Sequence, residues 1–467
     1  MTPSPDAAGP RQIGDTAYYI VAILVGAATG VIGTLLHLGV DTLLHWPKAL
    51  HRVIDDLVDV SVPQAILIAG GAAALAVVLS VWITRTFAPE AGGSGVQEIE
   101  GAMEGRREVR WRRVLPVKFC GGLLALGSGL VVGREGPTIH MGASVAQAAS
   151  ETLGLPVRET RGLLAAGAAA GLAAAFSAPL ASILFVIEET RRQFPYCLRT
   201  YTAVMLASVT SGIVTEELTG RRPFMFVSVP ELPLAALPAF VGLGIVLGIV
   251  GVGFNRSLVW SMDRALAFGR RTSFYIIPAV VGFVVGILLI VLPFATMGGE
   301  QLAVSLMSEN LPLAMMALAV FIRFIMTMAS YATGVPGGIF APILALATAI
   351  GLLYGLVLDA ALPYLLPAGA LPSGALPALA VAAMGGLFSA TVRAPLVGVV
   401  LIAELTGDYN AFVPAIVTCL FANLVADRLG GRPIYEVLLE RTLRLAGEAP
   451  PVPPASERRQ IGGWDQR

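Results

Sequence analysis

Long apolar segments with very few charges dominate this sequence. The first two, residues 17–44 and 64–87, are each long enough to cross the hydrocarbon core of a bilayer, which needs about 20 residues in a helix. Only 13% of the chain is charged and 56% is hydrophobic, whereas soluble domains carry about 25% charged residues. We therefore predict an all-α polytopic membrane protein embedded in a lipid bilayer.

Charge and composition exclude several kinds of site and partner. The chain has 31 basic and 31 acidic residues, so we expect no nucleic acid or other strongly charged partner. The histidines lack ligand spacing and the cysteines lie far apart, so we expect no metal, cofactor or disulfide framework. The cysteines are expected to be ordinary core residues: Cys120, Cys197 and Cys419.

A charged stretch interrupts one long apolar region. In Gly133-Arg134-Glu135-Gly136-Pro137 a carboxylate lies between two glycines, and Lys118 is the single charge in residues 114–132 before it. Pro137 suits the first turn of a helix, whose free N–H groups would point back toward Glu135 and form an anion site. Because a lone acid is costly within a membrane, Glu135 is a candidate functional residue. The alternative is a structural carboxylate that caps the helix.

The distribution of arginines orients the chain. Five arginines between residues 106 and 113 predict a cytoplasmic loop. Residues 114–132 then cover roughly 28 Å at about 1.5 Å per residue, which places Glu135 in the middle or outer part of the membrane. Glu189 shortly precedes two arginines and is expected near the cytoplasmic side. The two acids would then lie on opposite sides of the midplane; alternatively, Glu189 is an interface residue paired with one of these arginines.

Two stretches of the sequence repeat each other. Residues 171–179 resemble residues 386–395, and a glutamate follows nine positions after the proline of each copy. Arginines follow the first copy but not the second, which indicates that the copies end on opposite sides of the membrane, as in inverted repeats. The glutamate of the second copy, Glu404, is expected to pair with a buried arginine, Arg393 or Arg323, rather than to carry protons.

A polar, proline-containing connection divides the chain near its middle. Several apolar segments after it are shorter than a full span, and such interrupted segments are typical of a transporter site. We expect a cytoplasmic N-terminal tail at 1–16, membrane repeat 1 at 17–218, the connection at 219–233, membrane repeat 2 at 234–445, and a cytoplasmic C-terminal tail without a regulatory domain at 446–467.

Three breaks rich in glycine or proline place irregular backbone within the membrane, at residues 92–97, 133–137 and 337–342. Such backbone is tolerated only where it is buried in protein or lines a cavity. Moving a bare anion into a low-dielectric interior costs tens of kcal/mol in the Born limit, whereas one helix N-terminus returns roughly 0.3–2 kcal/mol. We therefore expect several breaks to converge on one anion site, to which Ser94 adds a hydroxyl donor.

Together the three breaks resemble the signature elements of the CLC family of chloride channels and proton-coupled chloride antiporters. These selectivity-filter elements are Gly93-Ser94-Gly95-Val96-Gln97, Gly133-Arg134-Glu135-Gly136-Pro137 and Gly338-Ile339-Phe340-Ala341-Pro342. The resemblance extends over residues 17–445. It implies two inverted-topology repeats of tilted, partly re-entrant helices. It also implies a homodimer, multi-pass in a prokaryotic plasma (inner) membrane, with both termini cytoplasmic.

The resemblance also implies roles for single residues. The chloride-binding groups are the hydroxyls of Ser94 and Tyr435 and the backbone amides of Ile339 and Phe340. Glu135 matches the gating glutamate, which competes with chloride when deprotonated and exchanges a proton with the outer side. Glu189 matches the inner proton-transfer glutamate found in exchangers and generally missing from channels, so it favours an antiporter of chloride and protons.

One departure and two alternatives accompany this interpretation. Gln97 stands where many exchangers of the family carry proline, which puts the turn after Ser94 in question. Within the family, the alternative is a passive chloride channel. A remote alternative is an intramembrane serine protease, because residues 92–95 read Gly-Gly-Ser-Gly; that chemistry needs a histidine base, and only His140 follows Ser94. We expect no enzymatic activity.

Overall fold

Helices make up most of the computed structural model, which describes residues 13–46, 62–220, 229, 231–299, 302, 305–307, 311–365 and 375–449. Within these residues, β pairing is limited to two isolated bridges. The tails expected at 1–16 and 446–467 lie largely outside the described residues, as does most of the connection expected at 219–233. The helical architecture confirms the all-α fold class.

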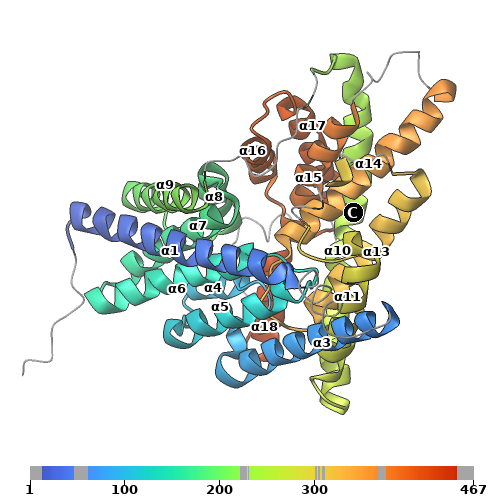
Figure 1. The fold of residues 1–467 in the computed structure, drawn as a ribbon. Coiled ribbons are helices and arrows are strands. Elements are labelled where there is room, and N and C mark those ends of the chain that lie inside the picture. The colour runs from blue at the N-terminus through green and yellow to red at the C-terminus, as the bar shows by residue number, and fades with distance from the viewer. Residues whose placement is uncertain are drawn as a thin grey trace, which may run out of the picture.

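The helices fall into two sets that follow each other along the chain. The first set is α1 (Asp15–Leu44), α3 (Val62–Phe87), α4 (Val96–Met103), α5 (Trp111–Gly127), α6 (Glu135–Leu153), α7 (Val157–Phe176), α8 (Pro179–Glu189) and α9 (Leu198–Thr219). The second set is α10 (Leu237–Arg271), α11 (Ile276–Val291), α13 (Leu313–Ala332), α14 (Phe340–Leu365), α15 (Ala375–Val392), α16 (Pro395–Thr406), α17 (Phe412–Arg428) and α18 (Ile434–Leu445). Figure 1 shows the sets side by side, with α3 reaching across to pack on α11.

The two sets repeat the same packing. In the first set α7 contacts α1, α6 and α9, and in the second α15 correspondingly contacts α10, α14 and α17. The residue that follows each of these helices has a left-handed backbone conformation: Ser177 after α7 with φ 50°, and Arg393 after α15 with φ 68°. The next residues also match, since Ala178 has φ −123° and ψ 75° and Ala394 has φ −121° and ψ 76°. The structure therefore confirms the repeat that the sequence predicts.

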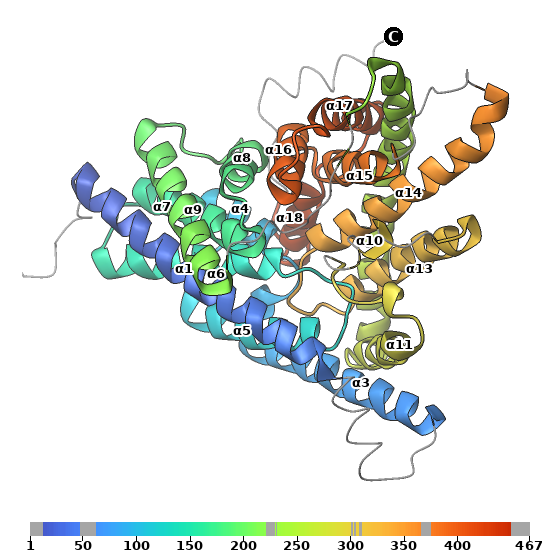
Figure 2. The same cartoon turned by 45° about the horizontal axis from the view of Figure 1, so that its top comes forward.

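The short helices α8 and α16 lie against each other at the junction of the two sets (Figure 2). At the end of α8, Glu188 accepts hydrogen bonds from two backbone N–H groups in the first turn of α16, at 3.4 and 2.9 Å. At the end of α16, Glu404 accepts two from the first turn of α8, at 3.0 and 2.6 Å. Each helix end thus meets the start of the other, so the two helices run antiparallel, as an inverted repeat requires.

This reciprocal capping corrects the expected role of Glu404. The prediction of an ion pair with Arg393 or Arg323 is wrong, because Arg393 binds Asp427 and Arg323 binds three backbone carbonyls of residues 296–298. The first N–H groups of a helix have no acceptor within that helix, and at membrane depth a carboxylate supplies one.

Helix length separates full membrane spans from partial ones. Among the described residues, six helices are long and apolar enough to cross a membrane: α1, α3, α10, α13, α14 and α15. In contrast, α4, α8 and α16 have 8, 11 and 12 residues, too few for a span.

Small residues bring α6 and α7 together, since a Cβ on Gly142 would lie 2.1 Å from the carbonyl oxygen of Gly167. Partial spans and close packing place chain breaks inside the protein.

The cysteines differ from expectation. Cys419 is buried, but Cys197 is partly exposed and Cys120 is exposed on α5. The prediction that all three are core residues is therefore wrong for Cys120. An apolar neighbourhood in the sequence does not predict burial here, because the outer surface of a membrane helix is apolar as well.

Candidate functional site

The three predicted breaks meet at one buried place. Gly93 N–H donates to the Val335 carbonyl at 2.9 Å, and Gly337 N–H donates to the Gly93 carbonyl at 3.1 Å. Gly133 and Gly338 exchange two further bonds, at 2.7 and 2.6 Å. Backbone hydrogen bonds therefore join the third break to both of the others.

The four residues predicted to bind the anion all lie here, and each is fully buried. The Ser94 hydroxyl faces the phenol of Tyr435, yet neither oxygen has a partner of normal hydrogen-bond geometry in the described part of the chain. Ile339 and Phe340 stand at the start of α14, and within the described residues their N–H groups donate to no acceptor. Since buried donors are nearly always satisfied in proteins, four donors at one place suit an anion.

Aromatic rings enclose this site. The rings of Phe340 and Tyr435 stack with centroids 6.1 Å apart and an interplanar angle of 28°. The ring centroids of Phe185 from α8 and Phe388 from α15 lie 5.1 and 4.8 Å from the ring centroid of Phe340. These contacts hold the Tyr435 phenol in place, because packed rings have little rotational freedom. No motif in the sequence marks Phe185, whereas Phe388 lies in the second copy of the repeat, at residues 386–395.

The carboxylate of Glu135 also lies near the start of α14, where Ile339 and Phe340 stand. Glu135 is fully buried as the first residue of α6. A Cβ on Gly133 would lie 2.0 Å from Glu135 Oε2 and 3.2 Å from the Ala341 backbone nitrogen, so the carboxylate folds back over the glycine toward the start of α14. A Cβ on Gly136 would lie 2.5 Å from Ser94 Oγ. The two glycines thus leave room for the Glu135 carboxylate and for the Ser94 hydroxyl.

Two basic residues support the breaks. The fully buried Lys118 donates to the carbonyls of Ala91 and Gly93 at 2.9 and 2.7 Å, and so holds the first break. Arg134 donates to the Ala175 carbonyl at 3.0 Å. The sequence analysis noted Lys118 only as a lone charge; the rule that singled out Glu135, an isolated charge in an apolar segment, would have identified it too.

On the side predicted to face the cytoplasm, called the inner side below, Glu189 has an acidic neighbour that no sequence pattern indicates. The carboxyls of Glu189 and Glu100 lie within hydrogen-bond reach of each other, and Glu100 is buried. Two carboxylates this close cannot both stay ionised without a large electrostatic cost, so a state with fewer than two charges is favoured here. Of the two arginines predicted as partners of Glu189, Arg192 pairs with Glu436 on α18, and Arg191 lies close enough to act on the Glu189 charge.

Small cavities lie beside both acids. One of about 60 Å³ is lined by Gly133, Arg134 and Asp41, next to the Glu135 break. Another of about 30 Å³ is lined by Glu100 and Glu189, among others. A water molecule needs about 10–15 Å³ of such space, so the cavities have room for about four and about two waters.

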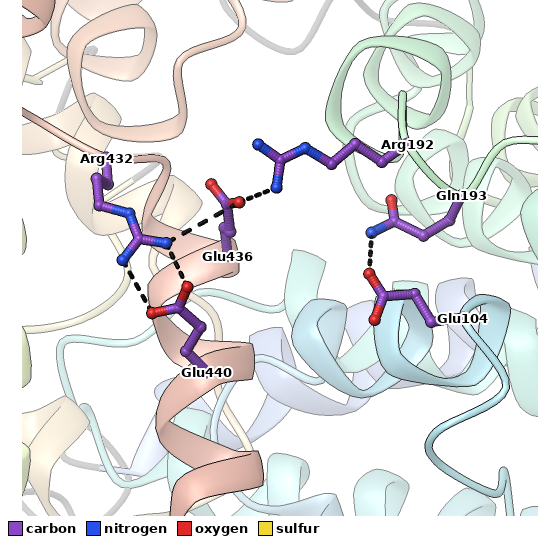
Figure 3. A network of polar contacts seen from close by, with 6 residues as sticks. All are labelled: Glu104, Arg192, Gln193, Arg432, Glu436 and Glu440. Atoms are coloured by element: carbon purple, nitrogen blue, oxygen red, sulfur yellow. Dashed lines mark hydrogen bonds and ion pairs between the residues drawn. The ribbon is translucent and has the colours of Figure 1, made fainter. Parts of the chain in front are cut away.

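A polar network surrounds the inner cavity (Figure 3). Glu436 on α18 pairs with Arg192 from the connection after α8 and lies 4.0 Å from Arg432. Arg432 also binds Glu440, with one of its two contacts at 2.9 Å. On the opposite side, Gln193 donates to Glu104 beyond the end of α4 at 2.7 Å. Charged groups from three parts of the chain therefore line the way to Glu189.

Gln97 and His140 also have defined places. Gln97 is buried, and its side-chain nitrogen lies 3.7 Å from where a Cβ on Gly93 would stand, so the glutamine folds back onto its own break. His140 packs against Gly95, with its ring atoms in the space of a Cβ there. Among the described residues, the Ser94 hydroxyl makes no hydrogen bond to His140. The geometry that activates a serine nucleophile is therefore not formed.

Comparison with known proteins gives consistent similarities. Residues 76–427 match the family model described as voltage gated chloride channel. The chain is 41% identical over 433 residues to the H⁺/Cl⁻ exchange transporter ClcA of Vibrio parahaemolyticus, covering 91% of this chain and 90% of that protein. It is also 41% identical over 429 residues to ClcA of Yersinia pestis bv. Antiqua, covering 91% and 87%.

Solved structures show the same fold. A slow cyanobacterial Cl⁻/H⁺ antiporter superposes with a TM-score of 0.82 at 35% identity, covering 93% of this chain and 99% of the other. A eukaryotic CLC transporter superposes with a TM-score of 0.72 at 24% identity, covering 91% and 74%. The second similarity concerns the fold alone.

Proposed function

Because the chain belongs to the voltage-gated chloride channel (CLC) family, we propose that it exchanges chloride for protons across the membrane. One observation carries the proposal: the carboxylate of Glu135 lies beside the same helix start whose N–H groups face the anion site. An acid and an anion that need the same donors exclude each other, and this exclusion is a direct way to couple their movements.

The coupling follows from charge. Ionised Glu135 competes with chloride for the N–H groups at the starts of α6 and α14, where the helix dipoles favour negative charge. Protonation removes the charge and with it the competition, so the side chain leaves and chloride enters. The cavity of about 60 Å³ is lined by Gly133 and Arg134, the two residues before Glu135, and a short movement of the Glu135 side chain would reach it.

The chloride site is assigned to four groups of this chain. The hydroxyls of Ser94 and Tyr435 and the amides of Ile339 and Phe340 would each donate one hydrogen bond to the ion. These bonds replace part of the hydration that chloride loses on entering, as in other selectivity filters. Lys118 acts on the ion indirectly, by holding the Gly93 carbonyl away from the site.

We assign the inner proton step to Glu189. Its carboxyl borders the inner cavity and shares a proton with Glu100, so a proton entering from the cytoplasm meets an acceptor there. The aromatic rings and the anion site lie between Glu189 and Glu135. Because none of these groups is proposed to carry a proton, the proton would cross this region along water molecules. Glu100 positions the proton and is not itself proposed as the carrier.

Reconstituted liposomes provide the test. An outward-directed chloride gradient should drive proton uptake against its own gradient, until the proton gradient balances the chloride gradient. A passive chloride channel, the second candidate, would show chloride flux with no uphill proton movement. The proposal assigns no enzymatic reaction.

The assembly and orientation are also proposals. Exposed apolar side chains extend across α8, α9, α16 and α17, including Leu180, Ile213, Leu396 and Ile416. These helices contact one another and join both repeats in one face, which suits a twofold homodimer. We place both termini in the cytoplasm of a prokaryote, with the protein in the plasma (inner) membrane and the repeats divided at residues 219–233. Cysteine cross-linking across this face tests the dimer.

A further inference from the structure

A basic cavity lies apart from the ion pathway, on the arginine-rich face of the protein. It has a volume of about 750 Å³ and is enclosed by the start of α5, the end of α6 and the start of α7. By the positive-inside rule, this face lies in the cytoplasm. Five arginines line the cavity: Arg107, Arg110, Arg112, Arg113 and Arg161.

Only some of these charges are neutralised within the protein. Arg107 pairs with Glu98 and Arg110 with Glu90, both at 2.8 Å. Arg112, Arg113 and Arg161 form no ion pair in the described part of the chain. Three guanidinium groups around one cavity favour an anion with several oxygens, because each group offers a planar set of donors.

Two acids at the cavity do not cancel this preference. Glu108 is exposed. Glu151, at the end of α6, accepts hydrogen bonds from Trp111 Nε1 at 2.8 Å and from Gln147 at 3.1 Å. These bonds lower the pKa of the Glu151 carboxyl and hold it at the rim. The oxygens of Glu151 thus already have donors; its charge also acts on Arg112 but leaves Arg161 unneutralised.

Arg161 is held in place without a partner for its charge. A Cβ on Gly105, where φ is +79°, would lie 2.7 Å from Arg161 Nη2, so the glycine makes room for the guanidinium. Arg161 Nε and the hydroxyl of Ser150, which also line the cavity, are buried without a hydrogen-bond partner among the described residues. Buried polar atoms are usually satisfied, and here a bound ligand would satisfy them.

An apolar groove adjoins the basic cavity at two of its arginines. The groove has a volume of about 680 Å³ and runs between α3 and α5. Its lining includes Arg112 and Arg113, which both hollows share, together with Ile83, Phe87, Pro116, Val117 and Cys120. Trp111 lines the basic cavity, and tryptophan is enriched at membrane interfaces. Charge on one side and apolar surface on the other match the chemistry of a phospholipid.

We propose that this site binds an anionic phospholipid of the cytoplasmic leaflet. Its phosphate headgroup would contact Arg112, Arg113 and Arg161, and an acyl chain would lie in the groove between α3 and α5. Basic pockets next to membrane helices on the cytoplasmic side are a known mode of lipid headgroup binding. The site is independent of the chloride and proton pathway proposed above.

Native mass spectrometry of the purified full-length protein tests the proposal. The protein is titrated with phosphatidylglycerol and separately with phosphatidylcholine, and bound lipid is counted per chain. We expect a preference of about tenfold or more for phosphatidylglycerol, which Arg112→Gln/Arg113→Gln/Arg161→Gln should abolish. Arg270→Gln is the matched control, because Arg270 is exposed at the end of α10, outside both hollows.

Three outcomes would overturn the proposal. They are equal binding of both lipids, unchanged phosphatidylglycerol binding by the triple variant, and displacement of phosphatidylglycerol by inorganic phosphate at equal concentration. The last would mean that the site takes a soluble phosphate instead of a lipid. If the triple variant does not fold, Arg161→Gln alone carries the test, with an expected loss of about fivefold in lipid affinity.

Discussion

The carboxyl groups of Glu100 and Glu189 face each other at the inner end of the proposed proton path. They come from α4 and α8, which lie on different sides of the inner cavity. Since a shared proton is the least costly state of two close carboxyls, we propose that Glu100 positions the proton that Glu189 accepts.

The pair predicts different effects for its two members. Glu189→Gln should stop proton movement while chloride flux continues, because an amide keeps the shape but cannot take up a proton. Glu100→Gln should keep proton transport, because the amide can still hydrogen-bond Glu189, which remains titratable. Proton and chloride fluxes in liposomes across a pH series measure both effects. Identical behaviour of the two variants would contradict the assigned roles.

At the outer end, Glu135→Gln should abolish coupling. Glutamine matches the size of the buried side chain but stays neutral, so it neither carries a proton nor competes with chloride as an anion. We expect chloride flux to persist and chloride-driven proton uptake to disappear in liposomes. Glu231→Gln, at an exposed acid outside the helices, serves as the control and should behave like the unmodified protein. Proton pumping by the Glu135 variant would refute the assignment.

The Tyr435 hydroxyl should contribute measurably to chloride binding. A hydrogen bond to a charged group is worth about 1.5–3 kcal/mol, so Tyr435→Phe should weaken chloride binding by about 10- to 100-fold. The ring contacts with Phe340 and Phe185 would remain. Tyr354→Phe is a matched control, since the Tyr354 hydroxyl donates to the Ala239 carbonyl at 2.9 Å, away from the site. Calorimetric titration with chloride measures the difference; equal affinities would exclude the hydroxyl as a ligand.

Features that depend only on a short stretch of chain were predictable from the sequence. A lone acid between two glycines, followed by a proline at a helix start, identifies the Glu135 break without any knowledge of its tertiary contacts. The repeat was visible for the same reason, because two copies of one local pattern end in proline and then glutamate. Their structural counterparts are the matching turns after Ser177 and Arg393.

Features that depend on contacts between distant segments were not predictable. Nothing near Glu100 in the sequence indicates that α8 brings Glu189 against it. Lys118 was seen as a charge but not as a donor to the Gly93 carbonyl. Glu404 was assigned an arginine, because arginine is the usual partner of a buried acid, and the free N–H groups of α8 were not considered.

The reciprocal caps of α8 and α16 should each stabilise the fold. Glu188→Gln and Glu404→Gln each remove a charge from a helix start, at a cost of about 0.3–2 kcal/mol. The two caps lie at opposite ends of an 11-residue helix, about 16 Å apart at 1.5 Å per residue, so the double variant should lose the sum of the single effects. Thermal unfolding of the purified protein in detergent measures the losses, with Glu216→Gln on α9 as control. A double variant no less stable than either single one would show that the caps do not act independently.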